Sequence, residues 1–434
     1  MRVSTATNTT LSESHLGGDQ QMKLISGQAP WERTLPHFPV YPVLDGDITC
    51  DCLIVGGGMG GAMASYRLSS SGVNTVVIDK HAVGNGSTYA NTGLLQVAND
   101  KSLTSCMNTF GADNGLLFYK LCRKALEDIL KLPGKLDIDP HIIPRSSLLY
   151  ASFPEDVAAL KTEHEHLAAH GFDTEFWEEN KIRAHYSFAK PAAIYSRGDA
   201  ETNPFRMLHS LIHKASASGV RVYEHTKARH FDFGTEGVTC YTESGRIFAN
   251  HVIFALGYET QEMKKDRGAK LIYTYAIMTR PLKNLPHWHE QSLIWETARP
   301  YLYFRTTNDG RIIAGGKDEQ LTDPQQREAR VRSQSQRLLE ELEALFPEIK
   351  GVSAEFSWGG VFGISHDGLP FIGPHPDYPH CYFIEGYGGN GTVYSMIAAE
   401  LLADTLAGIS RPELELFSLT RTSRPSPSSP AVRT

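Results

Sequence analysis

Asp51-Cys-Leu-Ile-Val-Gly-Gly-Gly-Met-Gly-Gly-Ala62 is the stretch that decides the fold of this chain. Its apolar run breaks into glycines and resumes as a helical pattern through Leu68, which predicts a buried parallel strand, a tight turn and a helix. Gly56, Gly58 and Gly61 have the spacing G-x-G-x-x-G. The first glycine permits the turn, the second lets the backbone approach a pyrophosphate, and the third lets the helix pack on the strand.

A second strand that ends in a carboxylate follows the predicted helix. Asn74-Thr-Val-Val-Ile-Asp79 is rich in β-branched residues, and Asp79 lies 18 residues beyond Gly61. An acid at this distance holds a ribose hydroxyl in dinucleotide-binding units. A lone glycine motif indicates only a turn that needs positive φ. Because strand, glycines, helix, second strand and acid occur in this order, the sequence favours a dinucleotide site.

Length and composition narrow the remaining function classes. The 434 residues are enough for two cores, and the formal charge of −7 argues against a nucleic-acid or anionic-membrane surface. Six scattered cysteines do not make a disulfide framework, and we interpret Cys50 and Cys52 as structural. No apolar run reaches the roughly 18 residues of a membrane helix, and the first residues lack a signal-peptide core. We therefore expect a cytoplasmic protein with a small-molecule partner.

The rest of the chain alternates between two kinds of structure. His251 to Gly257 is a third candidate strand of the nucleotide sheet, whereas alternating aromatic strands between Leu271 and Gly316 predict an antiparallel sheet with one face on a core and the other on a cavity. The fold class is therefore α/β, with a Rossmann-like domain interleaved with an antiparallel-sheet substrate domain. The expected boundaries are 49–140, 199–262 and 353–412 for the nucleotide domain, 141–198 and 263–352 for the substrate domain, and 1–30 and 413–434 for disordered tails.

Two further features concern ligands. Cys381 to Gly391 is predicted to be a strand that ends in glycines and is followed by an apolar helix. This is the same order of strand, glycine turn and helix as in the opening motif, and it would direct a second helix N-terminus at the dinucleotide. His166 and His170 are four residues apart on a predicted helix, but no third ligand accompanies them. We interpret the two histidines as part of a solvated face and predict no metal site.

Five sequence blocks together resemble the D-amino-acid-oxidase superfamily of FAD-dependent oxidoreductases. The likeness covers about residues 35 to 412, and the lead-in Tyr41-Pro-x-Leu44 is most similar to gamma-glutamylputrescine-oxidase-like members. The blocks are the glycine motif with Asp79, Gly86-Ser-Thr-x-x-Asn91-x-Gly93, Phe254-Ala-Leu-Gly257, Trp358-Gly-Gly with Asp367-Gly-Leu-Pro-x-Ile-Gly373, and Gly386-x-Gly-Gly-Asn-Gly391.

The resemblance implies a glutathione-reductase-type FAD domain, with the ADP half of FAD on the first motif and the isoalloxazine between the Ser87–Leu95 and Gly386–Thr392 loops. It also implies oxidation of a C–N bond by hydride transfer to flavin N5, with oxygen or another acceptor reoxidising the flavin. FAD is expected to be non-covalent, because Tyr89 and Ala90 stand where tethered members carry histidine. The implied cofactor residues are Gly56, Gly58, Met59, Gly61, Asp79, Lys80, Ser87, Thr88, Asn91, Thr92, Gly93, Leu95, Ala228, Ala255, Gly257, Gly360, Gly388, Gly389, Asn390, Gly391 and Thr392.

The departures from the family pattern bear on the substrate. Phe362, Gly389, Val393 and Gln96 stand where family members place the basic residues that hold a substrate carboxylate. A buried carboxylate needs a charged partner, so an amine without an adjacent carboxylate is favoured. Arg305 or Arg280 could replace the lost anchors, which keeps a glycine-, D-amino-acid- or sarcosine-type oxidase open. A flavin-binding subunit or sensor without turnover is the second alternative.

Candidate pocket residues come from the aromatic strands and the late blocks. Trp and Tyr side chains on one sheet face could surround an ammonium by cation–π attraction, with Glu296 as the counter-charge. The alternatives are core packing for the aromatics, a surface pair for Glu296 and Arg305, and a turn cap for His366. The candidates are Tyr275, Trp295, Glu296, Tyr301, Tyr303, Arg305, Phe362 and His366.

Overall fold

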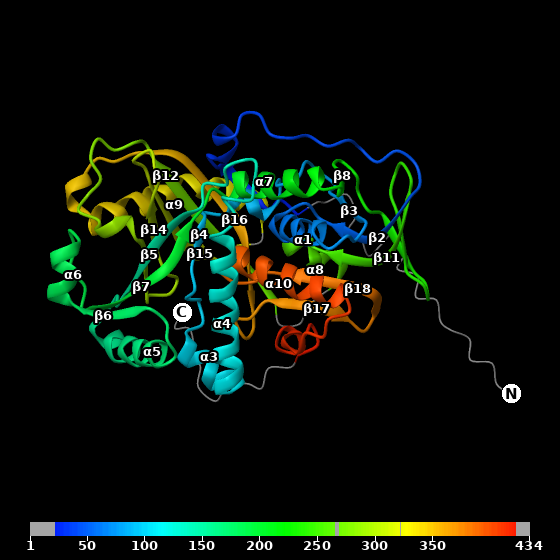
Figure 1. Ribbon diagram of the computed structural model, residues 1–434. Helices are drawn as coiled ribbons and strands as arrows, with labels where there is room; N and C mark the ends of the chain where they lie inside the picture. Colours follow the sequence, from blue (N-terminus) through cyan, green and yellow to red (C-terminus); the bar gives the residue numbers. More distant parts are fainter. Residues whose placement is uncertain (1–21, 265–268, 322, 422–434) are drawn as a thin grey trace.

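A computed structural model describes residues 22–264, 269–321 and 323–421 of the chain. Two β-sheets lie side by side, with the long helix α4 (Ala112–Ile129) between them in the view of Figure 1. The sheet at the right carries the N-terminal glycine motif, and the sheet at the left contains the aromatic strands. The α/β fold class predicted from the sequence is confirmed.

The eight-stranded sheet is the nucleotide sheet. Its main order is β17-β18-β11-β2-β3-β8, in which the strands from β18 to β8 run parallel and β17 is antiparallel to β18. β9 and β10 extend it as antiparallel strands beside β11. The strands are β2 (Ile48–Val55), β3 (Thr75–Ile78), β8 (Arg221–Tyr223), β9 (His230–Phe233), β10 (Val238–Tyr241), β11 (Arg246–Phe254), β17 (Phe371–His375) and β18 (Tyr378–Glu385).

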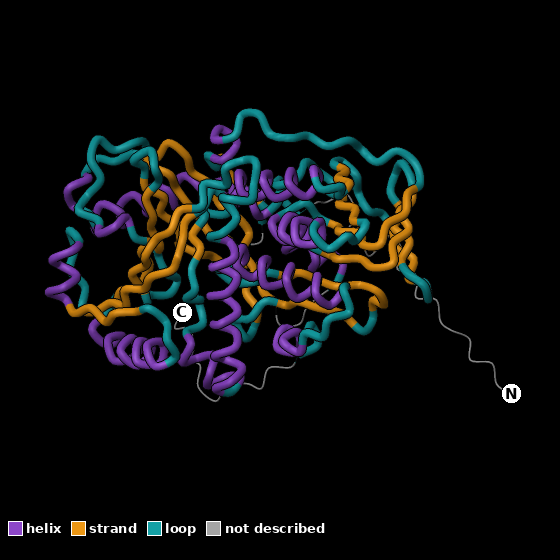
Figure 2. The backbone as a smooth tube through the Cα atoms, viewed as in Figure 1, coloured by secondary structure: helices purple, strands orange, loops and turns teal. Residues whose placement is uncertain are grey.

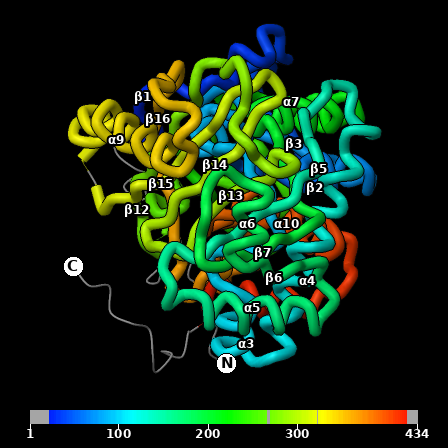
Figure 3. Tube along the Cα trace, turned by 90° about the vertical axis from the view of Figure 1, so that its left-hand side faces the viewer, coloured from blue at the N-terminus to red at the C-terminus, as the bar shows by residue number. Residues whose placement is uncertain are grey.

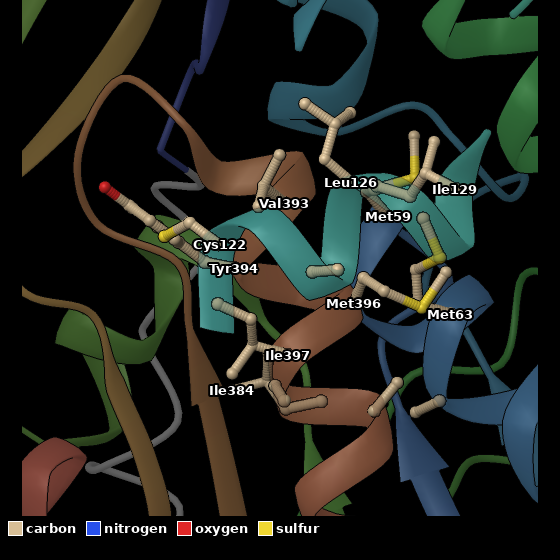
Figure 4. Close-up of a cluster of buried hydrophobic side chains, with 14 of the residues drawn as sticks. Met59, Met63, Cys122, Leu126, Ile129, Ile384, Val393, Tyr394, Met396 and Ile397 are labelled. Carbon is tan, nitrogen blue, oxygen red and sulfur yellow. The ribbon is translucent and has the colours of Figure 1, made fainter. Parts of the chain in front are cut away.

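Three helices pack together to form the core beside this sheet. Side chains of α1 (Met59–Ser69), α4 and α10 (Gly391–Leu406) point toward one another in Figure 4. Met63 of α1, Leu126 of α4 and Ile397 of α10 are each at most 3% exposed. α7 (Pro204–Ala217) packs on the other side of α1. Figure 2 shows these helices against the parallel strands. They cover one face, and the other face packs against Phe231 of β9 and Val238 of β10, so the parallel sheet is buried on both faces.

The ten-stranded sheet has the order β1-β16-β12-β15-β14-β13-β5-β7-β4, with β6 paired to β7. All pairs are antiparallel except β13 with β5, which run parallel, whereas the sequence predicted an entirely antiparallel sheet. The strands are β1 (Ile25–Gln28), β4 (Leu94–Leu95), β5 (Ile143–Tyr150), β6 (Thr174–Glu178), β7 (Ala192–Glu201), β12 (Ala269–Thr279), β13 (Leu293–Glu296), β14 (Tyr303–Thr306), β15 (Ile312–Glu319) and β16 (Ala354–Ser365).

Helix α9 (Pro324–Leu345) covers one face of the ten-stranded sheet, next to β1, β12, β15 and β16 (Figure 3). The remaining α-helices are α2 (Ser87–Ala90), α3 (Leu103–Phe110), α5 (Val157–Ala169), α6 (Glu179–His185) and α8 (Thr260–Met263). Within the described ranges, none of the helices has both the length and the apolarity to cross a bilayer. All six cysteines are buried free thiols.

Several segments differ from the expected organisation. Ile25–Gln28 forms β1 and pairs with β16, so the part of the expected tail after residue 21 is ordered, while residues 1–21 lie outside the described residues. Residues 413–421 are also ordered, because Arg421 donates to both Asp367 carboxylate oxygens at 2.8 and 3.0 Å. β16 was expected in the nucleotide domain but pairs with β1 and β12 in the other sheet.

The helix core provides a stability prediction. We expect Leu126→Ala to lower the free energy of unfolding by about 2–5 kcal/mol, because the lost side chain is fully buried and leaves a cavity. The measurement is the shift of the urea midpoint. Ile409→Ala is the control, because Ile409 is 53% exposed and its truncation should change the free energy of unfolding by only about 0.5 kcal/mol. Equal shifts for the two variants would contradict the assignment of this core.

Candidate functional site

A cavity of about 800 Å³ lies at the carboxyl ends of the parallel strands and extends to the ten-stranded sheet. Its lining includes the glycine turn after β2, the loop through Ser87, the turn at Gly257 and the late loop at Gly388. Aromatic side chains of β13 and β14 complete the wall. Ligands of open α/β sheets bind at this edge, and the volume is typical of small-molecule and cofactor sites, roughly 300–1,000 Å³.

The glycine turn is built by close backbone contacts. Gly56 has φ of +112°, and a Cβ at this position would overlap the carbonyl of Ala255, at the end of the neighbouring strand β11. A Cβ at Gly61 would likewise overlap the carbonyl of Gly56. Gly58 precedes α1 and lines the cavity together with Met59 and Gly60, so the start of this helix faces the cavity, although the Met59 N–H already donates to Thr88 Oγ1 at 3.0 Å. The turn therefore presents backbone N–H groups to a ligand, as the motif predicts.

Asp79 fixes the turn from the next strand. Its Oδ2 accepts a hydrogen bond from the Gly57 N–H at 2.7 Å, and its Oδ1 accepts from the His81 N–H at 2.8 Å. Burial raises the pKa of Asp79 to about 6, although both backbone hydrogen bonds oppose this shift. Lys80 Nζ lies 2.8 Å from Glu259. The carboxyl group thus lines the cavity beside the turn and can meet a ribose hydroxyl there.

The late glycine loop approaches the same cavity from the C-terminal part of the chain. Gly388 has φ of +111°, and α10 begins just beyond it at Gly391 without a side-chain cap. Asn390 Nδ2 donates to the Gln96 carbonyl at 2.6 Å, and Asn91 Nδ2 donates to Thr392 Oγ1 at 3.2 Å. These bonds connect the late loop to the loop Ser87–Leu95 and the adjoining Gln96, which we call the early loop. The starts of α1 and α10 both face one cavity, so partial positive charge from two helices acts there.

Most of the expected cofactor residues line this cavity, but three do not. Gly61 supports the packing of α1, and Gly93, with φ of +78°, lies against the Thr202 carbonyl. Leu95 is fully buried in the helix core, because side chains alternate along β4 and Leu94 is the one that faces the cavity. Those that line it are Gly56, Gly58, Met59, Asp79, Lys80, Ser87, Thr88, Asn91, Thr92, Ala228, Ala255, Gly257, Gly360, Gly388, Gly389, Asn390, Gly391 and Thr392.

Four of the candidate pocket residues, Trp295, Tyr301, Tyr303 and Phe362, form an aromatic wall at the sheet end of the cavity. The rings of Trp295 and Tyr301 are 6.1 Å apart at 77°, and those of Tyr301 and Tyr303 are 6.1 Å apart at 53°. A side chain at Gly315 would overlap the Tyr303 ring, so this glycine makes room for the wall. The wall can hold the apolar part of a ligand and attract a cation.

Tyr275 and Glu296 were expected in the pocket but lie outside its lining. The Tyr275 ring packs in the core under α9, and its hydroxyl donates to Glu319 at 3.0 Å. Glu296 follows Trp295 on β13 and points to the opposite face, where it accepts hydrogen bonds from Tyr150 at 3.1 Å and from Ser152 at 2.9 Å. Strand alternation separates each of them from the cavity face.

Arg305 and His366 also lie outside the cavity lining. Arg305 is 3% exposed and donates to the carbonyls of Thr92 at 2.7 Å and Thr202 at 3.2 Å, so it braces the early loop from behind. Its charge partner is Glu201 at 3.5 Å, not the Glu296 of the expected surface pair. His366 Nε2 lies 3.6 Å from Asp367, and the Asp367 carboxylate, not the imidazole, accepts from the turn N–H of Leu369.

Four acidic residues that the sequence did not indicate also line the cavity: Glu259 and Glu262, and Asp100 and Asp318 near the aromatic wall. A β-bulge places Asp318 there, because two residues of β15, Lys317 and Asp318, lie opposite the single residue Thr274 of β12. Strand periodicity cannot predict a bulge, so the expected alternation gave no signal for Asp318. Asp100 lies in a loop between β4 and α3, where sequence patterning is weakest.

Comparison with known proteins agrees with this geometry. The probable oxidoreductase OrdL of Rhizobium meliloti is 24% identical over 92% of both chains, and the gamma-glutamylputrescine oxidoreductase of Escherichia coli is 24% identical over 86% of this chain and 87% of its own. The crystal structure of glycine oxidase from Geobacillus kaustophilus superposes with a TM-score of 0.74 at 22% identity, covering 86% of this chain and 99% of that one.

The family comparison extends over most of the chain. The model of the DAO family, described as FAD dependent oxidoreductase, matches residues 51–405. That range contains the glycine turn, Asp79, the early and late loops and the aromatic wall, which surround the cavity. With its two helix N-termini, the Asp79 carboxyl group and the glycine turn, the cavity fits a dinucleotide such as FAD. The chain therefore belongs to the DAO family of FAD-dependent oxidoreductases.

Proposed function

We propose that this protein oxidises a C–N bond of an amine that lacks an adjacent carboxylate. The observation that carries the proposal is the composition of the cavity wall near the late loop, where aromatic rings and two carboxylates stand and no arginine does among the described lining residues. Bound FAD supplies the acceptor chemistry, in which flavin N5 takes a hydride equivalent from the carbon next to nitrogen. The imine product then hydrolyses, and oxygen or another acceptor restores the flavin.

The three cavity-lining positions at which family anchors are replaced support an amine over an amino acid. Phe362, Gln96 and Gly389 all line the cavity, and none of them carries a positive charge. Val393, the fourth such position, is fully buried in the helix core. A substrate carboxylate placed against this wall would be desolvated without a charged partner, which costs several kcal/mol.

Arg305, the replacement anchor that an amino-acid oxidase would need, already has partners. Its guanidinium donates to Thr92, Thr202 and Thr306 carbonyls and lies near Glu201. Its side chain lies on the same face of β14 as that of Tyr303, but it would have to abandon these bonds to meet a substrate. Arg280 lies at the end of β12, outside the cavity lining. An amino-acid oxidase remains the second candidate because relatives of this chain include glycine oxidases.

One set of cavity residues would bind the cofactor, and another set would bind the substrate. The glycine turn and Asp79 would hold the ADP half of FAD, and the Asn91–Thr392 and Gln96–Asn390 hydrogen bonds would keep the two loops together around the flavin. Trp295, Tyr301 and Tyr303 would orient the amine and exclude water. We propose that FAD is held without a covalent bond, since the described lining contains no cysteine and its one histidine, His81, lies beside Asp79.

The amine assignment predicts the outcome of anaerobic flavin reduction with matched pairs of compounds. Propylamine is compared with 2-aminobutyrate, and diaminobutane with ornithine, so that each pair differs by one carboxylate. We expect the amine of at least one pair to bleach the flavin absorbance at least about tenfold faster than its partner, because the carboxylate finds no cation at the wall. Faster reduction by the amino acids would favour the glycine-oxidase type, and flavin that no amine or amino acid reduces would indicate a binding subunit or sensor.

Cofactor retention provides a separate prediction. We expect Gly56→Ala to purify with little or no FAD, because a Cβ at this position overlaps the Ala255 carbonyl and opens the turn. Gly72→Ala is the matched control. Gly72 also has positive φ, +74°, but a Cβ there meets no atom within 4 Å, so this variant should keep its flavin. Flavin content is measured by absorbance after denaturation in acid. Full flavin in Gly56→Ala would contradict the assigned site.

A further inference from the structure

Resting on the proposed function, we infer that the substrate is a diamine or longer polyamine, whose second ammonium group is held by Asp100 and Asp318 at the aromatic wall. Both carboxylates line the same cavity as the early and late loops. They come from segments far apart in the sequence and are brought together by the fold. They take the role of counter-charge that the sequence assigned to Glu296, whose side chain points to the opposite face of the sheet.

Asp100 is held at the edge of the late loop by two contacts. Its Oδ2 accepts a hydrogen bond from the Gly389 N–H at 2.9 Å. A Cβ on Gly389 would lie 3.0 Å from the Tyr301 hydroxyl and 3.1 Å from the same Asp100 oxygen, so the three groups meet at one point. Burial, followed by the Asp100 charge, keeps the pKa of Tyr301 well above its usual value. The phenol therefore stays protonated and donates to Asp100.

The β-bulge decides which charge faces the cavity from β15. Lys317, with φ of +59°, directs its ammonium to Glu341 of α9, on the far side of the sheet. Asp318 then faces the cavity beside Thr274, which lies between the two register positions on β12. Without the extra residue, regular alternation would put Lys317 on the cavity face and Asp318 under α9. The bulge thus places the Asp318 carboxylate, and not the Lys317 ammonium, on the cavity face of β15.

The basic residues of the cavity lining are paired with glutamates or lie at the Asp79 end. Lys80 pairs with Glu259 at 2.8 Å, and Lys23 pairs with Glu328 at 2.9 Å. Lys227 and His81 stand at the Asp79 end. Arg299 donates to the carbonyls of residues 296–298 and, at 3.5 Å, to the backbone carbonyl of Asp100. It stacks on Tyr301, 5.0 Å from the ring centre, but lies outside the lining. The aromatic end therefore carries two carboxylates and no lining cation among the described residues.

This charge pattern selects for a second cationic nitrogen. The reacting amine must be neutral when its carbon gives up a hydride, so it cannot satisfy a carboxylate as a cation during the step. A second ammonium keeps its charge and can bind the two acids, while the faces of Tyr301 and Tyr303 add cation–π attraction. A monoamine leaves both carboxylates without a partner from the substrate. The wall therefore favours diamines over monoamines of the same length.

Binding and turnover of diaminobutane and butylamine by the holoenzyme test the inference. We expect diaminobutane to bind at least about tenfold more tightly by anaerobic calorimetry. Asp318→Asn and Asp100→Asn should each weaken the binding of diaminobutane about ten- to a hundredfold. The binding of butylamine should weaken less than about threefold. Asp377→Asn, in the turn between β17 and β18 and outside the cavity, is the control and should change neither. Flavin content confirms that each variant is folded and loaded.

The outcomes separate this inference from the proposed function. Equal affinity for the two amines, or equal losses in the Asp318 and Asp100 variants for both, overturns the inference even when both amines reduce the flavin. Selective diaminobutane binding that both variants weaken supports it even when no amine reduces the flavin, in which case the proposed oxidation fails. Lack of binding and reduction with every amine overturns both.

The pH dependence of binding gives a second readout. Burial, and to a lesser degree the nearby Asp100 charge, raise the pKa of Asp318 to about 6, while Thr274 and Arg299 oppose the shift and Tyr301 and Tyr303 stay neutral. As the pH falls through about 6, Asp318 takes up a proton and loses its charge, whereas the ammonium groups stay charged. Diaminobutane affinity should therefore fall below about pH 6, and Asp318→Asn should remove this dependence. An unchanged dependence in the variant would contradict the role of Asp318.

Discussion

The site depends on the close approach of backbone at the turn after β2. Gly56 lies against the Ala255 carbonyl of the adjacent strand end, and Gly61 lies against the carbonyl of Gly56, so neither position has room for a side chain. This contact sets where α1 begins and which N–H groups face the cavity. Asp79 closes the same turn through the Gly57 N–H. Because glycines occupy this turn, its backbone is open to an anionic group such as a phosphate.

The second half of the site is organised by hydrogen bonds between the early and late loops. Asn91 donates to Thr392 and Asn390 donates to Gln96, so segments about 300 residues apart are joined into one wall. Arg305 of β14 also supports this arrangement by donating to the Thr92 carbonyl. Arg305 thus affects the cavity indirectly, by holding the early loop in place. The shape of the cavity therefore depends on the contacts between the two sheets and the helix core.

The ten-stranded sheet shows how side-chain periodicity controls chemistry. Trp295 and Tyr303 face the cavity, while Glu296 and Tyr275 face away from it, although all four looked equivalent as strand residues. A single extra residue in β15 then places Asp318 at the wall and sends Lys317 to α9. Since a shift of one residue exchanges the two faces of a strand, a local bulge can reverse the charge that a substrate meets.

The sequence by itself determined the elements that depend on neighbouring residues, which are the glycine turn with Asp79 and the late loop before α10. It also indicated the family to which the chain belongs and the aromatic wall at Trp295, Tyr301 and Tyr303. Only the tertiary structure decided which strand residues face the cavity, that β16 joins the second sheet, and that Asp100 and Asp318 meet at one wall. The reason is physical: turns and helix starts depend on neighbouring residues, whereas a strand's register and its buried face depend on partners distant in the chain.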